Sequence, residues 1–331
     1  MGGLLGIDLG GTALKVVTTD GCAVTSEQTL STPSGGPKTI LNALTAVIDE
    51  HSGDGPVGLA VPGKYDRTSD RVLLLPNIDG DWREVGLAGT LSSLTGRRVV
   101  ICNDARAFAL AELRTGAARG LENVLFVAFG TGIGGAVAID GRLALGWHER
   151  AGEIGHTSID SSGPVCKCGS RGCLELYASA TALVANTRRF LQGVTGSTLQ
   201  GVDPEELTAQ LVFSSAMNGD RVAQAVVNEL AFALGRGLAP AVTLLAPEAI
   251  VIGGAGAASI VKWSDRIQSA IAQYARFPSC PRVLSATKGA HAGALGAALW
   301  ALELPHLHSH TTVSEPLAAH VSPRRGKLGL L

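Results

Sequence analysis

The 331-residue chain has almost no net charge. Its 27 Lys and Arg residues nearly balance its 28 Asp and Glu residues, which leaves a formal charge of −1. Proteins that bind nucleic acid or an anionic membrane usually present a basic surface, because phosphate groups have to be neutralised. The composition therefore gives no indication of a nucleic-acid or membrane partner.

Two kinds of apolar segment are also missing. The N-terminus has no basic region and Asp8 interrupts its first apolar stretch, so we expect no secretory signal peptide. No run of about 18 residues is free of Gly, Pro and charge, because residues 231–246 contain Arg236 and Pro240. Apolar residues still make up 46% of the chain, which predicts a globular protein with a large core.

The six cysteines do not form the pattern of a disulfide framework. Three are bunched between Cys166 and Cys173. The other three are scattered among apolar residues: Cys22, Cys102 and Cys280. Such usage is typical of a reducing compartment, and we expect a cytoplasmic protein.

An internal echo at a spacing of 120 residues organises the chain. Gly10 and Gly130 each follow a short apolar run, and Asp-Gly turns follow the next run at 20–21 and at 140–141. Both blocks are predicted to form strand, glycine turn, strand, Asp-Gly turn and strand. The echo suggests two half-molecules of similar topology, although such common turn residues could also match by chance.

Strands and helices alternate along the rest of the chain. Helices are predicted at residues 39–50, 85–94, 104–114, 181–191, 205–211, 220–245, 260–274 and 289–304. Pro240 is expected to kink or break its helix. The alternation predicts an α/β protein with two lobes, each a mixed β-sheet flanked by helices, and a cleft between them. We expect a small lobe (1–116, completed by 289–304), a large lobe (117–288) and a flexible tail (305–331).

Three glycine turns follow predicted strands. Asp8 stands beside the first turn, where bare backbone amides can bind phosphate oxygens while the carboxylate holds Mg²⁺. Gly130–Gly135 repeats the arrangement, and Gly253–Gly256 offers a backbone surface for adenosine. Each could be an ordinary tight turn, but their recurrence favours a nucleotide. None matches the Lys-bearing P-loop or the dinucleotide fingerprint.

Asp104 is the candidate catalytic base. Together with Asn103 it opens a predicted helix, where either residue could simply be the N-cap. The positive end of that helix is expected to lower the pKa of Asp104 and keep it ionised. An ionised Asp would suffice, because phosphoryl transfer requires an oriented hydroxyl more than a strong base.

A cysteine cluster follows the second glycine turn. Its metal-ligating side chains are His156, Cys166, Cys168 and Cys173. Three sulfurs and an imidazole fill the tetrahedron of Zn²⁺ and leave no open position, which predicts a structural zinc site; free buried thiols are the alternative. Glu153 and Glu175 flank the cluster and could accept hydrogen bonds from vicinal hydroxyls of a polyol, or could be surface charge.

Taken together, these motifs resemble the ROK family of sugar kinases and regulators, in the actin/hexokinase-like ATPase superfamily. The resemblance covers roughly residues 6–302, and its most specific part is the cysteine motif with its upstream Glu-Ile-Gly-His. The segments that carry it are Asp8–Thr12, Asn103-Asp104, Gly130–Gly135, Glu153–His156, Cys166–Glu175 and Gly253-Gly254.

The resemblance implies an ATP-dependent kinase that phosphorylates a primary hydroxyl of a hexose-like polyol, with Asp104 as general base. Implied substrate contacts are Asn77, Asn103, Asp104, Glu153, His156 and Glu175. Implied nucleotide and phosphate contacts, with Mg²⁺ near the first of them, are Asp8, Gly10, Gly11, Thr12, Lys15, Gly130, Thr131, Gly132, Gly253 and Gly254. The family also implies a structural Zn²⁺ on His156, Cys166, Cys168 and Cys173, and a homodimer.

Two departures from the family pattern leave the substrate open. Ala13 stands where many family kinases have Lys, with Lys15 further on, and Gly146–Arg150 is bulkier and more charged than usual. Glucose, mannose, an N-acylhexosamine and a sugar-like cyclitol are therefore all candidates, and polyphosphate could replace ATP. A catalytically idle sugar sensor is disfavoured because Asp104 and the phosphate turns are retained. The helix-turn-helix of family repressors is not expected, since the first strand begins by residue 4.

Overall fold

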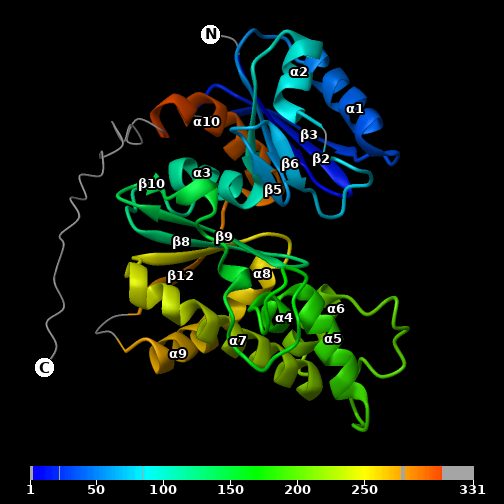
Figure 1. Cartoon of the computed structure of the whole chain (residues 1–331). Helices are drawn as coiled ribbons and strands as arrows, with labels where there is room; N and C mark the ends of the chain where they lie inside the picture. Colours follow the sequence, from blue (N-terminus) through cyan, green and yellow to red (C-terminus); the bar gives the residue numbers. More distant parts are fainter. Residues whose placement is uncertain (1–2, 22, 84, 277–279, 308–331) are drawn as a thin grey trace, which may run out of the picture.

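The computed structural model describes residues 3–21, 23–83, 85–276 and 280–307. It contains two five-stranded sheets, one in the upper and one in the lower part of the molecule in Figure 1. Cys22 and the predicted tail from residue 308 onward lie outside the described residues.

The two sheets have the same topology. The N-terminal sheet has the order β3-β2-β1-β4-β7, formed by Val24–Ser31, Ala13–Thr19, Leu4–Leu9, Val57–Val61 and Val99–Asn103. The C-terminal sheet has the order β10-β9-β8-β11-β12, formed by Arg142–Leu143, Ile133–Ile139, Val124–Phe129, Ala249–Gly253 and Arg282–Ser285. In each sheet the first three strands are antiparallel and the last two join in parallel. The similar topology of the two halves is confirmed.

Helices cover the sheets, as the fully buried central strands β4 and β11 require. The α-helices are α1 Gly36–Glu50, α2 Leu87–Thr95, α3 Asp104–Thr115, α4 Glu175–Ala178, α5 Ala180–Leu191, α6 Ala209–Met217, α7 Arg221–Leu245, α8 Ala257–Ile260, α9 Ser264–Tyr274 and α10 Ala292–Leu307. Single 3₁₀ turns lie at Trp147–Glu149, Ile154–His156, Val261–Trp263 and Gly289–His291. A small hairpin, β5 Lys64–Asp66 and β6 Arg71–Leu74, projects from the N-terminal sheet.

Four helix predictions need correction. The helix expected at 205–211 begins only at Ala209, because the Thr208 side chain caps it by accepting a hydrogen bond from Leu211 N at 3.2 Å. The helix expected at 260–274 is interrupted by the 3₁₀ turn that precedes α9. Of the kink or break expected at Pro240, the break does not occur, because α7 runs through Pro240 to Leu245. Helix α10 continues to Leu307, so residues 305–307 of the predicted tail are helical.

Helices α3 and α10 fill the space between the two sheets (Figure 1), and one hydrophobic cluster there joins residues of both halves. Helix α10 packs closely against β1 and α3. A Cβ on Gly6 would lie 1.9 Å from Ala294 O, and one on Gly296 would lie 1.7 Å from Ala107 O. Only glycine permits these approaches of one backbone to another. The division of the chain into lobes at residues 116 and 288 stays a prediction.

One buried carboxylate holds both segments that connect the two sheets. Glu112, on α3, is 0% exposed and accepts hydrogen bonds from Ala117 N at 2.7 Å, on the way from α3 to β8. It also accepts from Thr287 N at 2.8 Å and Lys288 N at 2.7 Å, on the way from β12 to α10. Both connections between the halves are therefore fixed to the same side chain.

Within the described part of the chain, α7 is the one helix long and apolar enough to span a membrane. Of its most apolar window, 61% is buried inside the protein. It packs against α5, α6 and α9 in the core of the C-terminal half. Its apolar character is that of a core helix.

Candidate active site

Asp104 lies where β7 ends and α3 begins. Asn103 is the N-cap of α3, because its Oδ1 accepts a hydrogen bond from Arg106 N at 3.2 Å. Asn103 Nδ2 donates to Asp104 Oδ1 at 3.0 Å, and Ala105 N donates to the same oxygen at 2.8 Å. The capping role proposed as an alternative thus belongs to Asn103, while Asp104 is held by hydrogen bonds on one carboxylate oxygen.

The expectation of a lowered pKa for Asp104 is wrong. Burial, together with the nearby charges of Asp8 and Glu153, raises the pKa of this carboxyl to about 7. These effects outweigh the hydrogen bond from Ala105 N and the helix terminus. A carboxylate with a pKa near neutrality is suited to accept a proton at physiological pH.

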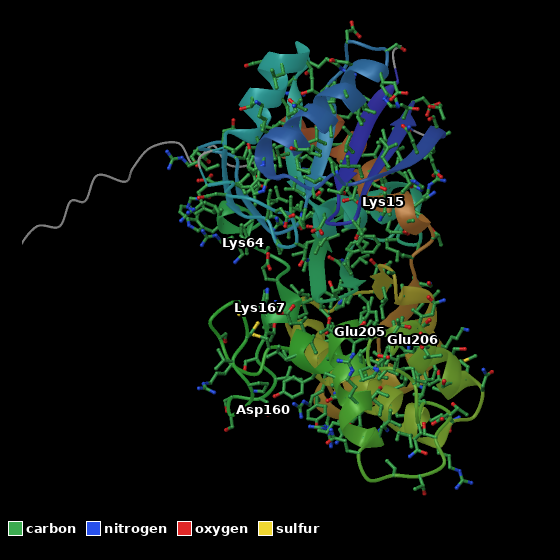
Figure 2. All side chains as sticks on the ribbon, turned by 90° about the vertical axis from the view of Figure 1, so that its right-hand side faces the viewer. Lys15, Lys64, Asp160, Lys167, Glu205 and Glu206 are labelled. Atoms are coloured by element: carbon green, nitrogen blue, oxygen red, sulfur yellow. The ribbon has the colours of Figure 1, made fainter. Side chains whose placement is uncertain are left out.

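Asp8 stands at the end of β1, beside the start of α10. A Cβ on Gly293 would lie 2.6 Å from Asp8 Oδ2, so glycine leaves the room that this carboxylate occupies. Lys15 is its direct partner on β2, with Nζ 3.8 Å from Asp8 Oδ2. Burial raises the pKa of Asp8, and the charges of Lys15 and His291 oppose that rise. Figure 2 shows Lys15 on the sheet of the N-terminal half.

The first glycine turn is closed by Gly10 N, which donates to Ala13 O at 3.0 Å. Gly11 and Thr12 are exposed. Asn77, far along the chain, lies against this turn, since a Cβ on Gly11 would be 2.6 Å from Asn77 O. The structure therefore brings Asn77 to the glycine turn of the N-terminal half.

The second glycine turn is closed by Gly130 N, which donates to Gly132 O at 3.1 Å. The start of α5 contacts it from outside, because Thr181 Oγ1 donates to Thr131 O at 2.8 Å. The third turn adjoins the second: Gly254, with φ of 91°, lies so close to Phe129 O that a Cβ would be 2.4 Å away. Gly253 and Gly254 thus belong to the same region as Gly130.

The two halves of the site meet at the start of α3. A Cβ on Gly134, in β9, would lie 3.1 Å from the Cβ of Ala105, so the residue after Asp104 packs against the second hairpin. A Cβ on Gly132 would lie 2.8 Å from Glu175 Oε2. The base candidate Asp104, the second glycine turn and the polyol-binding candidate Glu175 are therefore neighbours.

The cysteine cluster has the geometry of a tetrahedral site. The ligand atoms of His156, Cys166, Cys168 and Cys173 all lie within 4.8 Å of one another. Cys168 Sγ and Cys173 Sγ are 3.6 Å apart, and Cys166 Sγ is 3.8 Å from His156 Nδ1. Four ligands at about 2.0–2.3 Å from a Zn²⁺ ion would be separated by roughly 3.5–3.8 Å. The arrangement fits that ion.

The two flanking carboxylates differ in their surroundings. Glu175 Oε1 lies 3.1 Å from Cys166 Sγ and 3.5 Å from His156 Nδ1, so this side chain borders the cluster directly. Glu153 is exposed, and its charge still reaches Asp104. In Figure 2, Lys167 of the cysteine loop lies below Lys64 of the β5–β6 hairpin, on the same side of the molecule.

Comparison with known proteins identifies the family. The model of the ROK family matches residues 4–304. The glucokinase of Thermotoga maritima is 36% identical over 259 residues, which cover 76% of this chain and 81% of that protein. The N-acetylmannosamine kinase of Yersinia pestis is 32% identical over 308 residues, covering 91% and 99%. The crystal structure of a ROK family glucokinase from Streptomyces griseus, in complex with glucose and AMPPNP, is 31% identical with a TM-score of 0.78, covering 90% and 98%.

The chain belongs to the ROK family. The expected two-lobed actin/hexokinase-like fold is thereby confirmed.

Sequence reasoning missed one buried cation in this ROK protein. Arg106 is 7% exposed, two residues after Asp104, and its Nη2 donates to Ala151 O at 3.1 Å. Its Nε has no hydrogen-bond partner among the described residues. A second charge two residues after Asp104, between Ala105 and Ala107, is the signal that could have revealed it, because burying a cation is costly unless other groups compensate it.

Proposed function

We propose that this ROK protein transfers the terminal phosphoryl group of ATP to a primary hydroxyl of a hexose or hexose-like polyol. It is a glucokinase-like, ATP-dependent sugar kinase, as its family and relatives indicate. The observation that carries the assignment of the base is Asp104, a carboxyl with a pKa raised to about 7 at the meeting point of both halves.

In the proposed mechanism, Asp104 accepts the hydrogen bond of the substrate hydroxyl and takes its proton as the oxygen attacks the terminal phosphorus. The bond from that phosphorus to the bridging oxygen breaks, and ADP leaves with the electron pair. Asp104 needs only to orient the hydroxyl and to receive the proton late, because the transition state is loose. Asn103 would fix the carboxylate by its hydrogen bond at 3.0 Å.

Phosphate binding falls to the glycine turns in this proposal. The exposed backbone around Gly11 and Thr12, and that around Gly130 to Gly132, would receive the phosphate oxygens. Asp8 would hold Mg²⁺, directly or through water, and this ion would neutralise phosphate charge. Lys15 would then be released from Asp8 to act on a phosphate as a point charge.

The base of the nucleotide has a matching cavity nearby. A cavity of about 210 Å³ lies between α6 and the segment from Ser259 to Trp263, at the end of α8 and in the 3₁₀ turn that follows it. Phe213 and Trp263 supply aromatic surface there, and Gln210 supplies an amide. Stacking surface with a few polar groups is what an adenine ring requires.

We propose that His156, Cys166, Cys168 and Cys173 hold a structural Zn²⁺. His156 would use Nδ1, which faces the cysteines, and would keep Nε2 for a substrate hydroxyl. A bound ion would also fix Glu175 at the rim of the cluster, ready to accept hydrogen bonds from vicinal hydroxyls. The metal would hold the loop in place, without taking part in the transfer itself.

The sugar remains to be chosen among glucose, mannose, an N-acylhexosamine and a cyclitol. The relatives include both a glucokinase and an N-acetylmannosamine kinase at comparable identity. We further propose that the protein works in the cytoplasm as a homodimer, without a nucleic-acid partner. A sugar sensor without activity is the alternative from another class.

The test is ATP consumption over a panel of these sugars and cyclitols, repeated with polyphosphate as the donor. We expect turnover with at least one hexose-like polyol, and an Asp104→Asn variant that binds ATP but has lost turnover. Asp49→Asn, at an exposed site on α1, is the matched control and should behave as wild type. An Asp104→Asn variant with a near-normal rate would remove the assignment, and a wild type without turnover on any polyol would favour the sensor.

A further inference from the structure

The segment Gly146–Arg150, which departs from the family pattern, forms a loop closed on itself. Ala151 N donates to Leu145 O at 3.0 Å and closes the base of the loop. Gly146 has φ of 68° and fits against Ala151, where a Cβ would lie 2.9 Å from the Ala151 Cβ. The loop leads directly into Gly152 and Glu153, so its position determines where Glu153, a proposed substrate-binding residue, is placed.

Two consecutive residues of this loop hold a left-handed backbone. His148 has φ of 50° and Glu149 has φ of 55°. Neither is glycine, and such a conformation costs stability unless surrounding contacts fix it. Strained backbone of this kind concentrates at ligand clamps and switch segments, so contacts that stabilise the loop are expected.

The contact comes from the other half of the molecule. Arg67, at the tip of the β5–β6 hairpin, forms an ion pair with Glu149, and each side chain is 23% exposed. At the base of the loop, Arg106 of α3 donates to Ala151 O at 3.1 Å. The loop is therefore held at its tip and at its base by cations that follow β4 and β7 of the N-terminal sheet.

Hydrogen bonds hold the β5–β6 hairpin, which carries Arg67, in place. Tyr65 Oη donates to Asp70 Oδ1 at 2.6 Å, and Asp70 also accepts from Ala88 N at 2.9 Å and Gly89 N at 2.8 Å at the start of α2. At its root, Gly63 O accepts from Asn103 Nδ2 at 3.2 Å. The hairpin is thus fixed to the junction of β7 and α3, which carries Asn103 and Asp104.

We propose that Arg67 and Glu149 form a cross-lobe latch that closes the polyol site. The proposal rests on the proposed kinase function and deepens it. The latch joins the junction of β7 and α3, which carries Asn103 and Asp104, to the loop that leads into Glu153. A bound polyol would then be contacted by residues of both lobes. Arg67 and Glu149 are positioning residues, because they act through Asn103 and Glu153 rather than on the reacting atoms.

The test is steady-state kinetics with Glu149→Gln, Arg67→Gln and the exchanged pair Arg67→Glu/Glu149→Arg. Each single variant should raise the KM for the best sugar about 5- to 50-fold, with a smaller change in kcat and an unchanged KM for ATP. The exchanged pair should recover most of the lost affinity, which a general structural defect would not do.

The matched control is Glu303→Gln. Glu303 forms a bidentate ion pair with Arg114, at 2.6 Å and 2.8 Å, between α10 and α3. Its exposure is comparable to that of the latch, at 22% for Glu303 and 32% for Arg114. This variant should change thermal stability and leave the sugar KM alone. Single variants that match the wild-type sugar KM would overturn the latch, as would an exchanged pair no better than the singles. A wild type without sugar turnover would instead overturn the proposed function.

Discussion

The two hairpins that open the two halves share one topology and differ at two points. In the first, Leu9 pairs with Leu14 across a four-residue turn; in the second, Phe129 pairs with Ile133 across a three-residue turn. Asp8 and Ala128 hold equivalent positions, each two residues before the first glycine. The difference between Asp8 and Ala128 matters more than the difference in turn length, because only the first hairpin carries a carboxylate at this position.

The difference teaches how a repeated unit can acquire separate tasks. Opposite Asp8 the first hairpin places Lys15, and opposite Ala128 the second places Gly134, where the start of α3 packs. The first hairpin thus brings charge to the site, and the second brings close backbone packing against the base candidate. Both keep the exposed glycine turn that the proposed phosphate binding requires.

The halves differ again in what lies between their third and fourth strands. The first half places only α1 between β3 and β4. The second half places the loop at 146–151, the cysteine cluster and four helices between β10 and β11. In our account, the repeated hairpins bind the phosphates, and the larger insertion contributes the sugar-binding groups and, through α6, part of the adenine cavity.

The largest effect is expected from removing the charge that distinguishes the first hairpin. Asp8→Asn should lower kcat about 10²- to 10³-fold, because the proposed ligand of the Mg²⁺ ion that neutralises the phosphates is lost. Ala128→Ser at the equivalent position should leave kcat near the wild-type value. The comparison would break if steady-state rates showed both variants equally impaired, or neither.

The next effect concerns the insertion that only the second half carries. Cys168→Ser should lose bound zinc and weaken sugar affinity about 10- to 100-fold, because the loop bearing Glu175 is no longer fixed. Metal analysis beside a sugar titration measures both. Cys280→Ser is the control, an exposed thiol outside the cluster. A variant that lost zinc but kept full sugar affinity would separate the cluster from the substrate.

A smaller effect separates the two glycine turns. A Cβ on Gly130 would meet no atom within 4 Å, so Gly130→Ala should fold normally and yet raise the KM for ATP, by up to about 100-fold, through displaced phosphates. Gly11→Ala would press on Asn77 O and should lower stability by about 1–3 kcal/mol. Thermal melts beside ATP kinetics test this contrast. An unchanged ATP KM in Gly130→Ala would mean that the second turn is only a tight turn.

Local patterns made much of the fold and part of the site predictable. The echo of glycine and Asp-Gly turns gave the repeated topology, because each turn acts within a few residues. The spacing of Cys166, Cys168 and Cys173 likewise placed a four-ligand cluster together with His156. In both cases the residues that matter are close in sequence.

What could not be predicted depends on residues that only the fold brings together. The pKa of Asp104 rises through burial and through Asp8, so the local rule for helix starts gave the wrong direction. The ion pair of Arg67 with Glu149 joins distant segments, and a charge pattern cannot show such a partner. The helix expected at 205–211 begins later, at Ala209, for a local reason, because Thr208 is its N-cap.

The most direct test of the account is the pH dependence of kcat/KM for the best sugar. The pKa of about 7 for Asp104 means that the carboxyl is protonated below that value and cannot accept the hydroxyl proton. We therefore predict that kcat/KM falls as the pH drops, with a midpoint near 7 in the free enzyme. A profile that stays flat from roughly pH 5.5 to 8.5 would contradict the role of Asp104 as the proton acceptor.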